Sequence, residues 1–160
     1  MKTLLSSVAF AGLFFLFLAN PLPAQVSKKG KKEAAIKALI DAQYFTFEPQ
    51  TAIPLKMKIQ NLSSGFDLKV SKDAIEAYLP YYGRVYIPTV GITKSPLDFK
   101  TTTFKYEITP SKKGGWDITI TPKNVGDTRQ LVLSVAPGGN ASLQATFTSR
   151  DQINFNGHIH

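Results

Sequence analysis

The segment best suited to molecular recognition is a run of tyrosines near the middle of the chain. Within nine residues it places four tyrosines and one arginine: Tyr78, Tyr81, Tyr82, Arg84 and Tyr86. Tyrosine and arginine are over-represented at binding hot spots, because each combines a flat stacking surface with hydrogen-bond donors. We therefore predict a binding role for these five residues. The competing interpretation, a more common use of such rings, is that they plug one end of a β-barrel, with Gly83 allowing a tight bend.

Two histidines at the end of the sequence have the spacing of metal ligands. His158 and His160 lie two residues apart, so both imidazoles would share one face of a strand. The sequence identifies no third ligand beside them, and terminal residues usually fray. The chain contains no cysteine, which excludes disulfides, thiolate metal sites and a cysteine nucleophile. We therefore predict no metal and no cofactor.

Three carboxylates, Asp67, Glu107 and Asp117, fall at polar positions with lysine or threonine nearby. A glycan hydrolase would need two such groups facing each other across a cleft, and nothing in the sequence pairs two of them. The sequence also lacks the motifs of a serine hydrolase, a phosphate loop, a dinucleotide fold or a zinc protease. We therefore predict that the protein is not an enzyme, with a carboxylate-based glycan hydrolase as the weaker alternative.

Residues 1–24 have the pattern of a secretory signal peptide. One lysine precedes an apolar run from Leu4 to Leu18, and Asn20-Pro21-Leu22-Pro23-Ala24 ends the run with helix breakers and a small residue. We expect cleavage after Ala24 and a location in the periplasm or outside the cell; an uncleaved anchor is the alternative. The remainder of the 160-residue chain suffices for one domain.

The net positive charge is concentrated in one short run. Lysine and arginine outnumber acidic residues by 19 to 11, giving a formal charge of +8, and four of the lysines lie in Lys28–Lys32. Such a run is typical of a solvated segment, so we predict a basic linker over residues 25–32 and no nucleic-acid partner. Weak electrostatic contact of this linker with an anionic surface is the alternative.

The residue pattern changes once along the chain, from a helical period to a period of two. Apolar residues share one face of a predicted helix over residues 32–43. Eight later segments alternate apolar and polar residues: 45–48, 55–60, 66–71, 104–109, 116–121, 131–135, 143–148 and 153–159. Short, turn-rich connections favour hairpins over parallel strands. The predicted fold is mostly β: an antiparallel meander of about eight to ten strands forming a curled, barrel-like sheet with one N-terminal helix, over residues 33–160.

The region around Ile75 allows two interpretations. Asp73-Ala74-Ile75-Glu76 could open a single helical turn as a capping box. It could instead begin a strand, with Ser71-Lys72 as a tight turn that returns the chain from Val70. We favour the strand, because Val70 and Ile75 would then face each other.

The sequence Leu79-Pro80-Tyr81-Tyr82-Gly83-Arg84-Val85-Tyr86 resembles a family of small exported bacterial proteins classed as domain of unknown function 4251. The similarity includes the leader, the helix rich in lysine and alanine, the turn at Ser71-Lys72-Asp73 and the closing strand at Ile153–Gly157. It extends over nearly the whole chain after the leader, from Glu33 to Ile159. The resemblance implies an envelope location, and it carries over no functional residue.

These patterns predict an exported, non-enzymatic envelope protein that acts as a binding or interaction module. The expected recognition surface is the segment Tyr78–Tyr86 with the adjacent mouth of the sheet. Its partner would be a small apolar ligand inside the closed sheet or another envelope protein. A structural or assembly role in the envelope is the alternative.

Overall fold

The computed structural model describes residues 28–86, 94–112 and 114–160, which form one helix and ten strands. In chain order these are α1 (Lys28–Ala42), β1 (Phe45–Pro54), β2 (Gln60–Asn61), β3 (Asp67–Val70), β4 (Ile75–Tyr78), β5 (Asp98–Thr101), β6 (Phe104–Pro110), β7 (Trp116–Pro122), β8 (Thr128–Val135), β9 (Asn140–Phe147) and β10 (Ile153–Ile159). All the strands belong to one antiparallel sheet. The predicted fold class is confirmed for this part of the chain.

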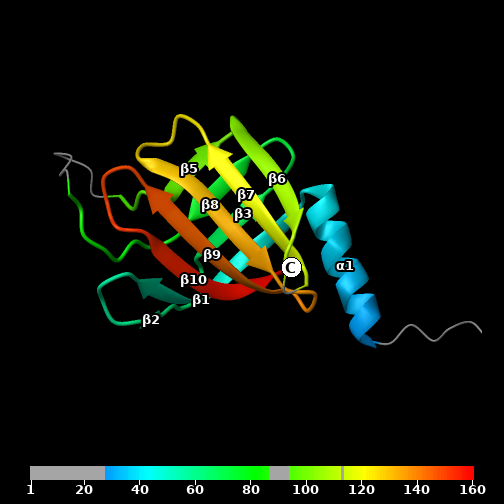
Figure 1. Cartoon of the computed structure of the whole chain (residues 1–160). Coiled ribbons are helices and arrows are strands. Elements are labelled where there is room, and N and C mark those ends of the chain that lie inside the picture. The colour runs from blue at the N-terminus through cyan, green and yellow to red at the C-terminus, as the bar shows by residue number, and fades with distance from the viewer. Residues whose placement is uncertain (1–27, 87–93, 113) are drawn as a thin grey trace, which may run out of the picture.

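The sheet curls into a nearly closed barrel (Figure 1). Its strand order is β5-β4-β3-β1-β10-β9-β8-β7-β6, with β2 paired to β1 beside this path. Most pairs join strands that are neighbours in sequence, as a meander requires, whereas β1 pairs with both β3 and β10. The two edge strands, β5 and β6, are separated by only Thr102 and Thr103, so the chain itself connects the edges. Insertion of β1 between β3 and β10 therefore completes the ring.

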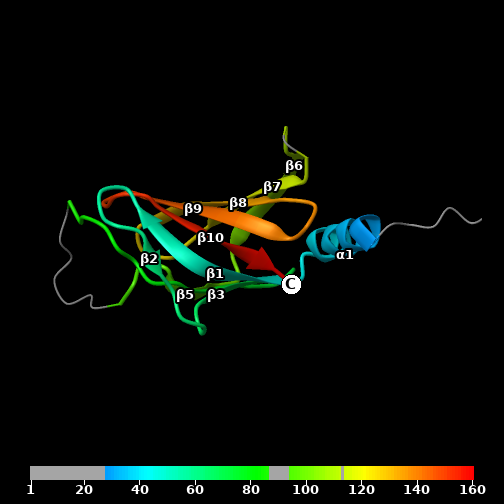
Figure 2. The same ribbon diagram turned by 90° about the horizontal axis from the view of Figure 1, so that it is seen from below.

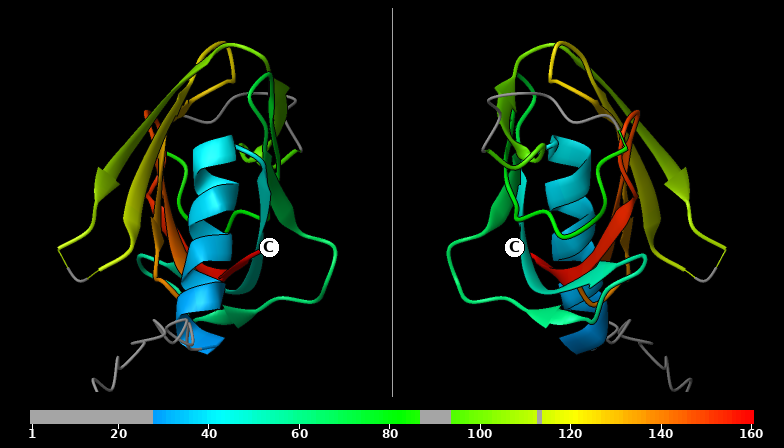
Figure 3. Two further views of the ribbon diagram at one scale, coloured as in Figure 1. Left: turned by 90° about the vertical axis from the view of Figure 1, so that its right-hand side faces the viewer. Right: turned by 90° about the vertical axis from the view of Figure 1, so that its left-hand side faces the viewer.

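The helix α1 covers one end of the barrel, between the two arms of the sheet (Figure 3). Its buried residues are Ile36 and Ile40, which lie one turn apart and face the core. The hydroxyl of Tyr106 on β6 donates a hydrogen bond to the carbonyl oxygen of Ile40 (3.4 Å). Gly139, with φ of +84°, allows a close approach, because a Cβ there would lie 2.9 Å from the Ile36 Cδ1. These contacts stabilise a helix that would be marginal in isolation.

The sequence predicted that the helix begins at Lys32, but it begins at Lys28. Residues 28–32 are helical, where the sequence analysis expected a linker. Lysine is a good helix former, and exposed lysines need no apolar partner to extend a helix that is already anchored further along. The apolar periodicity therefore predicted the part of the helix that is buried, and it gave no indication of the exposed first turn.

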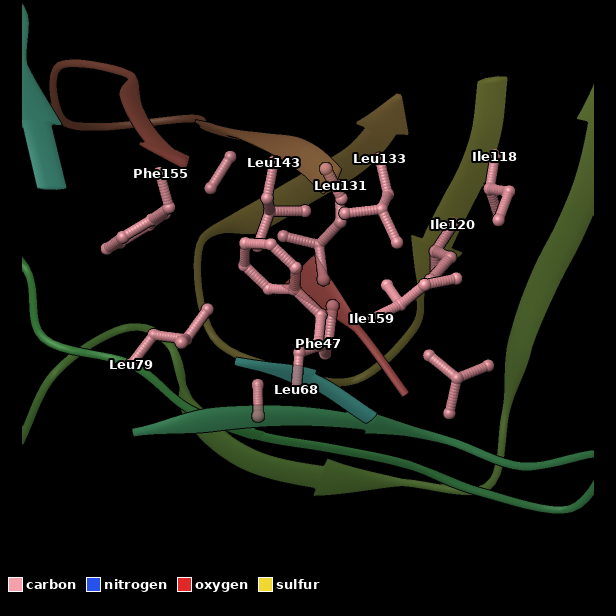
Figure 4. Close-up of a cluster of buried hydrophobic side chains, with 14 of the residues drawn as sticks. Phe47, Leu68, Leu79, Ile118, Ile120, Leu131, Leu133, Leu143, Phe155 and Ile159 are labelled. Carbon is pink, nitrogen blue, oxygen red and sulfur yellow. The ribbon is translucent and has the colours of Figure 1, made fainter. Parts of the chain in front are cut away.

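Apolar side chains fill the space between the walls of the barrel (Figure 4). Phe47 and Leu68 point from one wall toward Leu131, Leu143 and Phe155 on the other, and all five are fully buried. Burial of each such side chain stabilises the fold by about 1.5–3 kcal/mol. Side chains of the protein's own core therefore occupy the interior in which the sequence predicted a small apolar ligand.

The predicted strand over residues 55–60 is wrong. Strand β1 contains a bulge between Pro49 and Thr51. Before the bulge odd-numbered residues such as Phe47 are buried, and after it even-numbered residues such as Ala52 are buried, so the alternation changes phase. The strand then ends at Pro54, and Leu55, Met57 and Ile59 are exposed. An alternation that reads as a strand in sequence is therefore a solvent-exposed turn segment leading into the short β2.

The strand interpretation of the Ile75 region is confirmed. Strand β4 pairs with β3, and Ile75 lies directly opposite Val70. The Ser71 side chain holds the turn: its hydroxyl accepts a bond from the Ala74 amide (3.0 Å) and donates to the Ala74 carbonyl (2.9 Å). Strand β5, in contrast, was not predicted, because Asp98–Thr101 carries no clear alternation.

The expected signal peptide, residues 1–24, lies outside the described residues. Within the described ranges, no helix is long and apolar enough to span a bilayer.

Candidate interaction surface

The end of the barrel opposite α1 is closed by the segment that follows β4. Leu79 is buried, and Tyr82 packs against the core. The Tyr81 hydroxyl donates to the carbonyl oxygen of Asp151 (2.8 Å), and its ring meets the ring of Phe147 edge to face, with centroids 5.2 Å apart. Burial raises the pKa of Tyr81 to about 12, although the nearby guanidinium of Arg150 opposes this shift. Tyr81 and Tyr82 therefore act here as parts of a plug.

Main-chain hydrogen bonds attach this segment to the loop between β9 and β10. Val85 forms a bridge with Arg150, the Tyr86 amide donates to the carbonyl of Ser149 (2.8 Å), and the Asp151 amide donates to that of Arg84 (3.1 Å). The Tyr86 hydroxyl also donates to the Asp151 carboxylate, and this bond raises the pKa of Tyr86. The plug is thus fastened to residues about sixty-five positions away in sequence.

An ion pair also stabilises the loop between β9 and β10. The Arg150 guanidinium donates to the Asp127 carboxylate (2.7 Å), and the Ser149 hydroxyl donates to the same oxygen (2.6 Å). Burial alone would raise the pKa of Asp127, but these two hydrogen bonds and the charge of Arg150 outweigh it and lower the pKa. The Arg150 guanidinium also lies over the ring of Tyr81, 5.3 Å from its centroid.

Large apolar side chains that face solvent gather at this same end. Six of the eight in the described residues come from two segments, 55–59 and 78–86: Leu55, Met57, Ile59, Tyr78, Val85 and Tyr86, which together we name the distal patch. Figures 1 and 2 both place the β1–β2 connection and the segment that follows β4 at the end of the barrel away from α1. Tyr78 stacks on Phe66, with centroids 5.6 Å apart, and still exposes 54% of its surface. Three of the five predicted site residues, Tyr78, Arg84 and Tyr86, are therefore exposed in or beside the patch.

Basic side chains interleave the apolar ones in this patch. Lys56 and Lys58 alternate with Leu55, Met57 and Ile59, and all five residues are exposed. Neither lysine forms an ion pair within the part of the chain that the structure describes. Sequence reasoning missed this segment as a site because its alternation was interpreted as a buried strand. Pro54 is the residue that could have indicated the end of the strand, because proline has no amide proton to donate to a neighbouring strand.

A surface cleft of about 450 Å³ lies at the other end of the barrel, beside the last turn of α1. Its lining is mostly apolar and includes Leu39, Tyr44 and Val70, with Lys69 and His160 at its polar positions. Tyr44 follows Gln43, whose positive φ of 50° ends the helix and turns the chain into β1. The cleft has the size of a small-molecule site, in a region that the sequence did not single out.

Of the three carboxylates considered for a hydrolase, Asp67 lies apart from Glu107 and Asp117, which are diagonal neighbours across one hairpin. Asp67 is paired with Lys69 (3.1 Å) on β3. Glu107 and Asp117 lie on the β6–β7 hairpin, where Glu107 is opposite Thr119 and is exposed. Asp67 and Asp117 line different surface hollows. This arrangement gives no support to a carboxylate pair acting on a glycan.

His158 near the end of β10 and His160 directly after the strand lie side by side, as the sequence predicted, with ring centroids 5.7 Å apart. The structure adds a third group that sequence reasoning missed: Glu48 lies directly opposite His158 on β1. The pairing of the first strand with the last is what brings it there, and no local spacing in the sequence indicates that pairing.

The comparisons with known proteins agree with this fold. The model of the domain of unknown function DUF4251 matches residues 27–159. The chain belongs to this family. Among solved structures, it is similar to a crystal structure of a DUF4251 family protein from Bacteroides eggerthii DSM 20697, with a TM-score of 0.54 and 16% identity over 81% of this chain and 87% of that one. No curated protein matches the sequence. Membership in the DUF4251 family confirms the resemblance noted in the sequence and assigns no activity.

Proposed function

We propose that this DUF4251 protein is an exported, non-enzymatic envelope module that docks on an anionic membrane surface through the distal patch. The observation that supports this role is the gathering of exposed apolar side chains at one end of a barrel with an apolar core, together with two exposed lysines that form no ion pair with any described residue. The leader pattern of residues 1–24 supports export.

The chemistry of the patch fits a bilayer interface better than bulk water. Leu55, Met57 and Ile59 can enter the boundary between headgroups and acyl chains, while the lysines between them extend their ammonium groups to lipid phosphates. Tyr78 and Tyr86 carry the amphipathic ring that is enriched at this depth of a membrane. Each lysine near an anionic surface adds about 1 kcal/mol of attraction.

The test begins with protein recovered from the periplasmic or extracellular fraction, with its N-terminus read by mass spectrometry. We expect a chain that starts at Gln25; protein found only in the cytoplasm with Met1 intact contradicts export. Sedimentation with vesicles of phosphatidylcholine and phosphatidylglycerol then measures docking. A variant with serine at residues 55, 57 and 59 should lose about tenfold or more in partitioning. The matched control replaces Tyr44 and Ile108, exposed apolar residues outside the patch, with serine and should bind like wild type.

The charge contribution can be separated from the apolar one. Lys56→Gln with Lys58→Gln should weaken binding to the anionic vesicles by about fivefold per lysine and leave binding to pure phosphatidylcholine unchanged. Failure of wild-type protein to sediment with either vesicle contradicts membrane docking. Equal binding by the serine variant would show that the patch is not the docking surface.

A small-molecule role for the cleft beside α1 is the second candidate, favoured by its volume of about 450 Å³ and apolar lining. Native mass spectrometry of protein taken from its producing cells should then show a retained ligand that is lost in Ala74→Trp, because the half-buried Ala74 lines the cleft and a tryptophan there would fill it. A ligand retained equally by this variant contradicts the assignment.

A further inference from the structure

A cluster of three metal-ligand side chains lies where the first strand meets the last. Glu48 is directly opposite His158 in the β1–β10 register, and the His158 Nε2 lies 3.8 Å from a carboxylate oxygen of Glu48. His160 is held beside them by paired main-chain bonds: its amide donates to the Thr46 carbonyl (3.1 Å), and the Thr46 amide donates to its carbonyl (2.9 Å). One ligand atom from each of the three side chains lies within 4.8 Å of the other two.

The local backbone favours this proximity. Ile159 is buried, so the two histidines that flank it face outward together. Gly157 allows β10 to run unusually close to β1, because a Cβ at this position would lie only 2.0 Å from the Glu48 carbonyl oxygen. The bulge after Pro49 begins at the same point. The ligands are therefore set by two strands within a sheet and not by a mobile loop.

The donor set is that of a borderline divalent cation. Two neutral imidazoles and one carboxylate suit Zn²⁺ and its neighbours in the first transition row, with the remaining positions taken by water. Ligand atoms around a tetrahedral Zn²⁺ lie about 3.3 Å apart. The His158–Glu48 pair at 3.8 Å is close to this spacing, and no pair of ligand atoms needs to approach by more than about 1.5 Å. Half-exposed side chains achieve this by small χ rotations, and both Glu48 and His158 are of this kind.

We propose that Glu48, His158 and His160 form a Zn²⁺-binding site on the outer face of the β1–β10 pair. The ion ties the first strand of the barrel to the last, at the pairing that completes the ring. Because an ion that binds only the folded state stabilises it by mass action, Zn²⁺ raises the temperature of unfolding. This site is independent of the distal patch, which lies at the far end of β1.

The test is a calorimetric titration of untagged, chelator-treated protein with Zn²⁺. Wild type should bind one ion per chain. Glu48→Gln, His158→Asn and His160→Asn should each lower the affinity by about tenfold or more. The matched control is Glu107→Gln, an exposed strand carboxylate outside the cluster, which should bind like wild type. Thermal melts should show a Zn²⁺-dependent rise in wild type and the control, and little or none in the three ligand variants.

A second probe guards against a variant that fails to fold. Wild-type protein with Co²⁺ in place of Zn²⁺ should show the strong visible absorption of a four- or five-coordinate ion, whereas the weak spectrum of the hexaaqua ion overturns the proposal. Binding without saturation at one ion per chain also overturns it. Unchanged affinity in Glu48→Gln contradicts the three-ligand site, even if both histidine variants lose the metal.

Discussion

The two ends of the barrel are closed by different physical means. At the α1 end, Ile36 and Ile40 of a helix cover the core with apolar surface, and one tyrosine hydroxyl bonds to the helix backbone. At the distal end, Tyr81 and Asp151 form a network in which hydrogen bonds and an ion pair join three separate loops. One closure is a local amphipathic element, and the other is a set of long-range polar contacts.

This difference separates what each end can offer to a partner. The apolar face of α1 is buried against the core, and beside the helix lies the cleft lined by Leu39, Tyr44 and Val70. The plug at the distal end is joined mainly by polar contacts and leaves apolar residues, Val85 among them, facing solvent. Exposed apolar patches on soluble proteins are uncommon enough to indicate an interaction site. The comparison therefore favours the distal end over the α1 end as the surface for the proposed docking.

The largest expected effect breaks the helical closure. Ile40→Ala should lower the free energy of unfolding by about 2–5 kcal/mol, because it removes a fully buried side chain and leaves a cavity against the core. Urea denaturation measures the loss. Lys37→Ala, on the exposed face of the same helix, should change stability by only about 0.5 kcal/mol. Equal losses in both variants would show that α1 does not depend on its buried face.

Breaking the polar closure should cost less. Tyr81→Phe keeps the ring against Phe147 and removes the hydroxyl that bonds to Asp151, so we expect a loss of about 1–3 kcal/mol in the free energy of unfolding. Tyr44→Phe is the control, since Tyr44 is 71% exposed and should change nothing measurable. A Tyr81→Phe protein as stable as wild type would remove the hydrogen bond from the account of the plug.

Alkaline titration sharpens the comparison. The pKa of Tyr81 is raised from 10.0 to about 12, so its contribution to stability is fully present below pH 10 and is lost as the pH rises toward 12. Wild type should therefore destabilise over this window, and Tyr81→Phe should destabilise less. Burial also raises the pKa of Tyr106 at the helical end, so part of the loss should remain in the variant. An identical alkaline profile in the two proteins contradicts this assignment.

Acid titration should give the smallest effect and act on the distal end. The pKa of Asp127 lies below its ordinary value of 3.8, so the stability it contributes is present above that value and is lost as the pH falls through the lowered pKa. Asp127→Asn should be less stable than wild type at neutral pH and converge toward it in acid. Two parallel curves of stability against pH would contradict the role of the Arg150–Asp127 pair.

The sequence predicted those parts of the fold that depend on local pattern. A period of 3.6 around Ile36 and Ile40 predicted the helix, and alternation on strands such as β7 and β9 predicted their buried faces. The turn at Ser71 predicted the β3–β4 hairpin, because its side chain acts on a backbone only three residues away. In each of these elements the determining contact lies close by in the chain.

The missed features all depend on contacts between distant residues. The bulge after Pro49 reverses the phase of β1, so Leu55–Ile59 becomes an exposed segment although its alternation is that of a strand. The Tyr81 hydroxyl bonds to Asp151 across seventy residues, a contact that no local pattern in the sequence indicates. Glu48 joins His158 only because β1 pairs with β10. Single-sequence patterns carry no register between strands this far apart, since register is set by the closure of the whole sheet.

The most direct test places a fluorescent reporter at each end of the barrel. The chain contains no cysteine, so Met57→Cys and Tyr44→Cys each provide one site for a nitrobenzoxadiazole probe. Both positions are exposed in the protein, with Met57 in the distal patch and Tyr44 beside α1. On addition of anionic vesicles, we predict a blue-shifted, stronger emission from position 57 and an unchanged spectrum from position 44. No shift at position 57, or a shift at position 44 alone, would contradict docking through the distal end.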